Sequence, residues 1–125
     1  GDKTEDMKKI KIIDSLDLIR DDIKASFEEN YINVVNSHEN KMLFIGAVNQ
    51  YFKSLQSQGV LYDGADCKAY IDVESQREWL AQKYDVSDWT DSEVEVANTG
   101  SIIFAGADIT IQDCIEDLSF KIGLE

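Results

Sequence analysis

The spacing of hydrophobic residues changes along this 125-residue chain, from helical spacing in the first half to strict alternation in the last part. A chain whose apolar period switches in this way combines helices with strands, because each period buries one face of only one kind of element. Helical spacing is clearest at Ile12, Leu16, Ile19, Ile23 and Phe27. A second helical set comprises Phe44, Val48, Tyr51, Phe52 and Leu55. The first half therefore predicts two amphipathic helices, and Gly59 fits the left-handed position that ends the second.

Three later segments alternate apolar and polar residues, as a strand with one buried face does. The first runs from Cys67 to Val73. The penultimate strand has an apolar face made of Ile103, Ala105, Ala107, Ile109 and Ile111. The last strand, after a turn at Gln112-Asp113, has one made of Leu118, Phe120, Ile122 and Leu124. This order predicts an α+β fold in which two long N-terminal helices pack on a small, mostly antiparallel sheet.

The length of the chain predicts a single domain over residues 1–125. Residues 1–6 are charged and poor in apolar side chains, so we expect this end to be frayed. Residues 74–100 are predicted to form a short helical insertion between the first and second strands. Residues 114–125 are predicted to form a C-terminal arm.

Two capping-box patterns predict helix starts within the insertion. Ser75 precedes Glu78 by three residues, and Thr90 precedes Glu93 in the same way. Apolar contacts of the insertion are expected from Trp79, Leu80, Tyr84 and Trp89.

The net charge of −13 is concentrated in the second half of the chain. Residues 60–125 carry fifteen acids against four bases. Such a surface repels phosphate groups, so we expect no nucleic-acid partner. The acids are explained either by a solvated surface or by an acidic face that matches a basic partner. No run of 18 apolar residues occurs, so the sequence predicts no membrane anchor.

The residues that carry catalysis or bind metals are scarce. His38 is the only histidine and falls in the polar break between the two predicted helices, where a loop or capping role is expected. Cys67 and Cys114 lie far apart and outside any zinc-binding spacing. Nucleotide-binding and nucleophile motifs are absent, and nearly all carboxylates fall on predicted polar faces. We therefore expect a protein that is not an enzyme, with no catalytic residue, no metal and no cofactor.

The strand at the end of the chain allows two interpretations. It is either an ordinary last strand of its own sheet or a strand donated to a neighbour's sheet, since a terminal strand has only one connection. The residues alone leave both interpretations open.

Three segments resemble the C-terminal domain of contractile-tail sheath proteins, which form phage tails and phage-tail-like bacteriocins. They are LQSQGVL at residues 55–61, ANTGS at residues 97–101 and AGADITIQDCIEDLSF at residues 105–120. The order of the three segments carries the resemblance, because each alone is a weak motif. Many family members have a proline at the corner before the last strand, whereas this chain has Gln112-Asp113-Cys114 there.

The resemblance implies a structural subunit of a contractile tail sheath. In that family, subunits stack in rings around an inner tail tube protein and are joined by exchanged terminal strands. Contraction then drives the tube through a cell envelope without a nucleotide or catalytic residue. The chain is accordingly expected to be the C-terminal assembly domain of a longer subunit, assembled in the bacterial cytoplasm into a virion or phage-tail-like particle. Its expected partners are other sheath subunits in a helical stack and the tube protein.

The resemblance also assigns candidate residues. The exchanged strand is expected to use Ile115, Leu118, Phe120, Ile122 and Leu124. A tube-facing helix is expected from Gln76 to Lys83, with Arg77 and Lys83 as its bases. The alternative is that this helix closes the domain with Trp79 and Leu80 packed inward.

Two other classes of function stay open at this point. An acidic adaptor that does not polymerise could bind a partner through a sheet edge. A hydrolase could use clustered acids, although the sequence offers no nucleophile or metal-binding set to accompany them.

Overall fold

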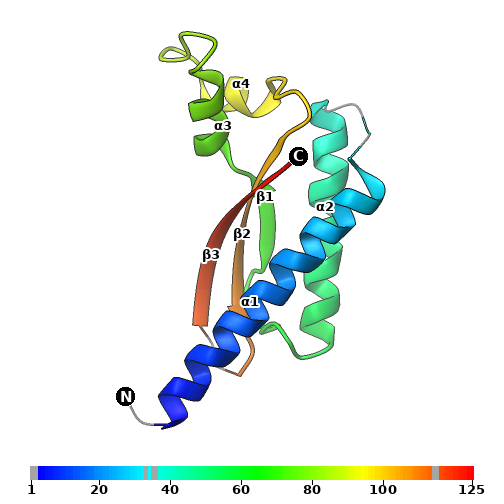
Figure 1. Ribbon diagram of the computed structural model, residues 1–125, viewed down its shortest axis with the longest axis vertical. Coiled ribbons are helices and arrows are strands. Elements are labelled where there is room, and N and C mark those ends of the chain that lie inside the picture. Colours follow the sequence, from blue (N-terminus) through cyan, green and yellow to red (C-terminus); the bar gives the residue numbers. More distant parts are fainter. Residues whose placement is uncertain (1–2, 33, 35–36, 114–115) are drawn as a thin grey trace.

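The computed structural model describes residues 3–32, 34, 37–113 and 116–125. Two long helices and a three-stranded antiparallel sheet form the body of the molecule, and a pair of short helices lies at one end of the long axis (Figure 1). The predicted α+β fold, with two long helices on a small antiparallel sheet, is confirmed.

The two long helices are α1 (Lys3–Asn30) and α2 (His38–Ser57). Four of the six residues predicted to fray, from Lys3 onward, belong to α1. Helix α2 begins inside the predicted polar break, because the Ser37 hydroxyl accepts a hydrogen bond from the Asn40 amide at 3.2 Å. It ends as predicted near Gly59, which has a φ of 77°.

The sheet has the order β1-β2-β3, with β2 (Ile103–Ile111) between β1 (Lys68–Ile71) and β3 (Glu116–Leu124). Both pairings are antiparallel, and Ala107 on β2 lies opposite Ala69 on β1 and Phe120 on β3. The first strand is shorter than the predicted segment from Cys67 to Val73, because helix α3 (Val73–Leu80) begins directly after it.

The core lies between the two long helices and one face of the sheet. The predicted apolar face of β2 is buried along its whole length, at Ile103, Ala105, Ala107, Ile109 and Ile111. From the helices, Phe44 and Phe52 are fully buried, and the Phe27 ring meets the Phe44 ring edge-on at 5.7 Å. Full burial of such a side chain contributes roughly 1.5–3 kcal/mol, so this layer contact is the main source of stability.

In the described part of the chain, the opposite face of the sheet is met by a helix only at one end, where the Trp79 ring of α3 lies 6.4 Å from the Phe104 ring. Tyr70 from β1 lies flat across Gly106, where an added Cβ atom would come within 2.5 Å of the ring. The Tyr70 hydroxyl donates to the Asp108 carboxylate at 3.1 Å, and Ser119 donates to the same oxygen at 2.8 Å. Polar contacts between side chains of neighbouring strands therefore cover this face, whereas α1 and α2 cover the other face.

The insertion contains α3 and α4 (Asp91–Val96), packed around Leu80, Val86 and Val94. The capping box predicted at Thr90 is confirmed. The one predicted at Ser75 is wrong, because the Asp72 carboxylate accepts the hydrogen bond from the Ser75 amide and caps the helix three residues earlier.

The aromatic residues of the insertion are placed unequally. Trp79 and Trp89 pack against its small core, as expected. Tyr84 is exposed and stacks on Trp89, with ring centroids 5.9 Å apart, so it does not belong to that core. Tyr84 lies in the loop between the two short helices, because α3 ends at Leu80, before the helical turn that would have placed Tyr84 on the buried face.

A buried lysine joins the insertion to the helical layer. Lys41 on α2 is fully buried, and its ammonium donates to the Ala97 carbonyl at 3.1 Å and to the Gln76 amide oxygen at 3.5 Å. Gln76 in turn donates to the Val94 carbonyl at 2.6 Å. Desolvation by burial lowers the pKa of Lys41 to about 8. The position of the insertion on the body thus depends on a polar network inside the protein.

Candidate functional site

The terminal strand β3 occupies an edge of the sheet. It pairs with β2 along its whole length, and no strand lies on its other side among the residues that the structure describes. An edge strand presents unpaired backbone groups on its outer side, which another chain can bind.

Four of the five residues predicted for the exchanged strand lie on its core side. Phe120 and Leu124 are buried, while Leu118 and Ile122 are partly buried against the same core. Ile115 lies outside the described residues. The predicted apolar face of β3 therefore packs in this structure against the core of its own chain, and its exchange between chains stays a prediction.

Contacts on both faces hold β3 in place. On the core side, the Arg20 guanidinium of α1 lies 5.4 Å from the centroid of the Phe120 ring, a cation–π contact. On the open side, the Thr110 hydroxyl donates to the Asp117 carboxylate at 2.7 Å. The strand is thus fixed by its neighbours α1 and β2.

Lys121 connects β3 to the insertion. Its ammonium lies 3.0 Å from a Glu74 carboxylate oxygen and 3.7 Å from Asp72. The hydrogen bond that the Lys121 ammonium donates to the Glu74 carboxylate is the main cause that raises the pKa of Lys121. Because Lys121 and Glu74 are exposed, salt weakens this link.

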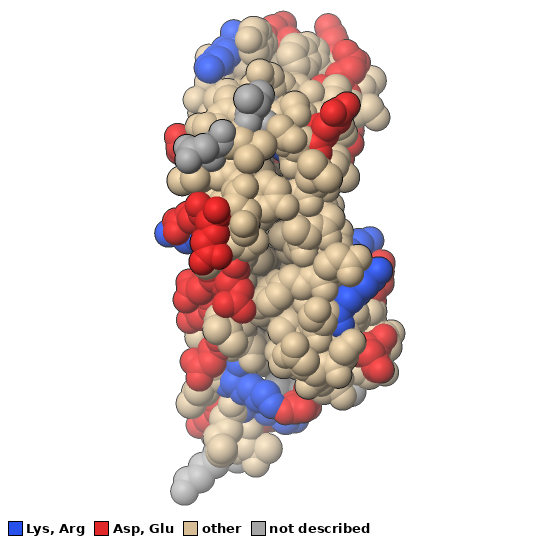
Figure 2. All heavy atoms as spheres, turned by 90° about the vertical axis from the view of Figure 1, so that its right-hand side faces the viewer, with Lys and Arg blue, Asp and Glu red and all other residues tan. Residues whose placement is uncertain are grey.

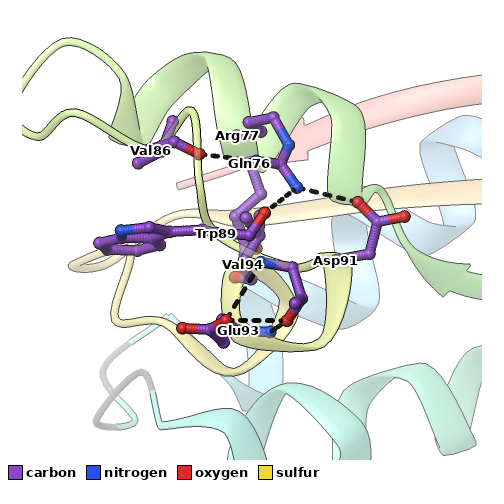
Figure 3. Close-up of polar contacts among 8 residues, drawn as sticks. Gln76, Arg77, Val86, Trp89, Asp91, Glu93 and Val94 are labelled. Atoms are coloured by element: carbon purple, nitrogen blue, oxygen red, sulfur yellow. Dashed lines mark hydrogen bonds and ion pairs between the residues drawn. The ribbon is translucent and has the colours of Figure 1, made fainter.

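Arg77, one of the two predicted tube-facing bases, is engaged within the insertion. Its guanidinium donates to the carbonyls of Val86 and Trp89 at 2.9 and 3.0 Å. It also donates to the Asp91 carboxylate at 2.9 Å (Figure 3). Arg77 therefore ties α3 to the following loop and to the start of α4.

Lys83, the second predicted base, lies beyond its helix. The predicted helix from Gln76 to Lys83 is wrong at both ends, since α3 spans Val73–Leu80 with Ala81 as its C-cap. The Lys83 ammonium lies 4.5 Å from the centroid of the Trp79 ring. These internal contacts are those expected of a helix that closes the domain, and contact with a tube stays a prediction.

Charges are unevenly distributed on the surface. In the insertion, exposed acids occur at Glu74, Glu78, Asp85, Asp88, Asp91 and Glu93. By contrast, the exposed side of α2 has few charges, with Met42, Leu43 and Gly46 among its residues. On the face shown in Figure 2, this weakly charged area lies in the middle, beside a column of acids.

Structural features that accompany metal or membrane binding are missing from the described part of the chain. There, no group of three or more His, Cys, Asp or Glu side chains could hold a metal ion. Nor does any described helix combine the length and hydrophobicity that crossing a membrane requires. His38 is the first residue of α2, Cys67 is a partly buried free thiol, and Cys114 lies outside the described residues.

Sequence reasoning missed Lys41 and Gln76 as the residues that attach the insertion. Lys41 lies three residues before Phe44, on the helical face that continues to Val48, so its place on an apolar face was a detectable signal. Its partner Ala97 is 56 residues away and could not be identified from spacing.

Two comparisons with known proteins identify relatives. The family model described as the phage tail sheath C-terminal domain matches residues 2–125. A tail sheath protein of Clostridium phage phiCD119 is 36% identical over 124 residues, which cover 98% of this chain and 34% of that protein. The chain therefore spans about a third of the length of the curated relative that it matches.

Proposed function

Because this chain belongs to the phage tail sheath family and corresponds to its C-terminal domain, we propose that it joins neighbouring sheath subunits by exchange of its terminal strand. Its role in the phage tail is structural, as part of the virion particle. The finer proposal concerns how subunits are connected, and it depends on β3.

The observation that carries the proposal is the position of β3 at a sheet edge, at the end of the chain, with its apolar side chains in a core built by other elements. In an exchange, Phe120 and Leu124 would leave the core of one subunit and enter the same site in another. Because the two sites are identical, the buried apolar area and the pairing with β2 would be preserved. Only the connection after Ile111 would change its path.

The outer edge of β3 supports a second element of the proposal. Its unpaired backbone groups could accept an extended arm from a third subunit, which would enlarge the sheet beyond three strands. Each subunit would then be linked to more than one neighbour, as a stack of rings around an inner tube requires.

Contraction requires that such links survive when subunits slide and rotate. A paired strand with a flexible connection keeps two subunits attached while their orientation changes. We propose that the energy comes from larger interfaces in the contracted lattice, so neither a nucleotide nor a catalytic residue takes part. The subunits would assemble around the tube in the bacterial cytoplasm, before release of the particle.

The proposal is tested by a charge placed on either face of β3 in the complete sheath subunit. Phe120→Asp puts a carboxylate on the core side and should abolish sheath rods in electron micrographs. Gly123→Asp is the matched control, because a Cβ atom added there on the open side meets no atom within 4 Å, and rods should form. Rods formed by both variants would overturn the proposal.

A folding defect must be separated from an assembly defect in this experiment. Circular dichroism of the Phe120→Asp subunit should retain most of the helical signal, because α1 and α2 pack with each other through Phe27 and Phe44.

The alternative function, an acidic adaptor that binds a partner by edge augmentation, would also use the open edge of β3. No further observation favours it.

A further inference from the structure

The two edges of the sheet differ in what meets their outer backbone groups. Strands β1 and β3 flank β2, so one side of each faces away from the sheet. At the end of β1, the Asp72 amide donates to the Phe104 carbonyl of β2 at 2.9 Å. Because antiparallel strands exchange hydrogen bonds at every second pair, Tyr70 and Lys68 also turn their backbone groups toward β2. Ala69, between them, turns its N–H and C=O groups outward.

The side chain of Asn49 on α2 occupies both outward groups of Ala69. Its amide oxygen accepts a hydrogen bond from the Ala69 N–H at 2.8 Å, and its amide nitrogen donates to the Ala69 carbonyl at 3.4 Å. A neighbouring antiparallel strand would make the same two bonds at this residue. A primary amide offers the donor and the acceptor that a peptide group offers, so Asn49 stands where a fourth strand would pair. Figure 1 shows α2 running beside β1.

A second amide of α2 continues this cover beyond β1. Gln56 follows Asn49 by seven residues, about two helical turns, so both side chains lie on the same side of α2. The Gln56 amide nitrogen donates to the carbonyls of Tyr62 and Ala65, both at 3.0 Å. Tyr62 is itself joined to β2, because its N–H donates to the Thr110 carbonyl at 2.8 Å. Helix α2 therefore satisfies outer backbone groups along both segments that flank this side of β2.

The edge of β3 lacks such a cover in the part of the chain that the structure describes. Ala107 turns its backbone groups toward β3, where it lies opposite Phe120, because its β1 partner is Ala69. By the same alternation, the outward groups of β3 belong to the residues between those that pair with β2. These residues are Asp117, Ser119, Lys121 and Gly123. One edge of the sheet is thus closed by α2, and the other is open.

We propose that Asn49 closes the β1 edge to strand addition, so that a strand from a second copy of this chain can be added only beside β3. A sheet with two open edges could join copies β1 to β3 without limit, because a contact between two different edges repeats without closing. A sheet with one closed edge grows on one side only. This inference deepens the proposed function and rests on it, since the choice of edge matters only where copies are joined through strands. Asn49 is a positioning residue, because it acts through the Ala69 backbone.

Three variants of the 125-residue chain test the closed edge. Asn49→Ala removes both hydrogen bonds to Ala69 and should leave α2 intact, because alanine favours the helix. Asn49→Asp keeps an acceptor for the Ala69 N–H and places a charge at the edge, which opposes strand addition. The matched control, Gln50→Ala, changes the next residue of the same helix, which is exposed.

Association is measured by sedimentation velocity over a series of concentrations, and NMR follows the exchange of the Ala69 amide hydrogen. Asn49→Ala should associate about tenfold more tightly than the wild-type chain, whereas Asn49→Asp and Gln50→Ala should match the wild type. In dilute Asn49→Ala, the Ala69 amide hydrogen should exchange about tenfold faster than in the wild type. Its exchange should slow again as the variant associates, because the added strand then accepts its hydrogen bond.

Three results would overturn the inference. Asn49→Ala that is less stable to urea but associates no more tightly than the wild type would give Asn49 a stabilising role alone. Equal gains for Asn49→Ala and Asn49→Asp would trace association to lost stability instead of the freed Ala69 N–H. Association that leaves the Ala69 amide in fast exchange would put the new contact away from β1. None of these results changes the rods expected of the Phe120→Asp and Gly123→Asp subunits, so failure here and failure of strand exchange are distinguishable.

Discussion

The helical insertion and the terminal strand β3 both lie at the periphery of the same sheet, yet they are held in opposite ways. The insertion has its own small core around Leu80 and Val94, and Arg77 satisfies its loop carbonyls from within. Strand β3 has no core of its own, and Phe120 packs into one that α1 and β2 provide. In the proposed exchange, a neighbouring copy would supply the same contacts to β3, whereas the insertion makes its own.

Under the proposed exchange, this difference separates a part that stays with its own domain from a part that moves to a neighbour. The insertion keeps its internal contacts wherever the subunit goes. The strand keeps its contacts only if some copy of α1 and β2 is next to it. The proposed strand exchange would therefore change the free energy of the β3 contacts little, since the same contacts form before and after.

The largest effect on the free energy of unfolding is expected from Lys41, which joins the insertion to α2. It sharpens the comparison between the insertion and β3. Its pKa is about 8 when folded and 10.5 when exposed, so the unfolded chain binds more protons above pH 8. The free energy of unfolding should therefore rise with pH, by about 2 kcal/mol between pH 8 and about pH 9.5. Urea unfolding across this range measures the rise, and Lys41→Met should remove it. A flat profile for the wild type would show that Lys41 is not desolvated.

A smaller effect is expected from Arg77 inside the insertion. Arg77→Ala leaves the Val86 and Trp89 carbonyls without their donor and should cost about 1–2 kcal/mol. Hydrogen exchange should accelerate in the insertion and stay unchanged in β2 and β3. Lys83→Ala, which removes one contact on the Trp79 ring, serves as the comparison and should have a lesser effect. Equal acceleration in β3 would mean that the insertion is not a self-contained unit.

The smallest change in the free energy of unfolding is expected at the Lys121 contact, where β3 meets the insertion. Lys121→Ala removes the exposed link between β3 and Glu74, so stability should fall slightly at low salt and not at all at high salt. Urea unfolding at two ionic strengths measures the difference. A large, salt-independent loss would show that the insertion holds β3, and the contrast between the two regions would fail.

Much of the fold could be predicted because burial follows the alternation of side chains. The alternate residues from Ile103 to Ile111 are all buried, and Gly59 adopts the left-handed conformation that its position suggested. These features depend on nearest neighbours in the sequence, whose spacing is fixed by the strand or helix itself.

Other features depended on contacts that spacing does not reveal. Both Asp72 and Ser75 are good N-cap residues, and the end of β1 at Ile71 decides in favour of Asp72. The loop after α3 folds back and brings the Val86 and Trp89 carbonyls to Arg77, which the spacing of residues did not indicate. Contact of Arg77 and Lys83 with a tube stays a prediction. The apolar face of β3 was predictable, whereas the chain on which it packs in an assembly was not.

The central claim, that β3 is exchanged between subunits, is tested most directly by a disulfide across the β2–β3 pair. Asp108 and Ser119 lie opposite each other on the open face of the sheet, so Asp108→Cys and Ser119→Cys place two thiols together without disturbing the core. In the complete subunit, with Cys67 and Cys114 replaced by serine, the sheath is assembled, oxidised and run on a denaturing gel. Strand exchange predicts a ladder of covalently linked subunits, whereas a single band of monomers with internal disulfides would contradict it.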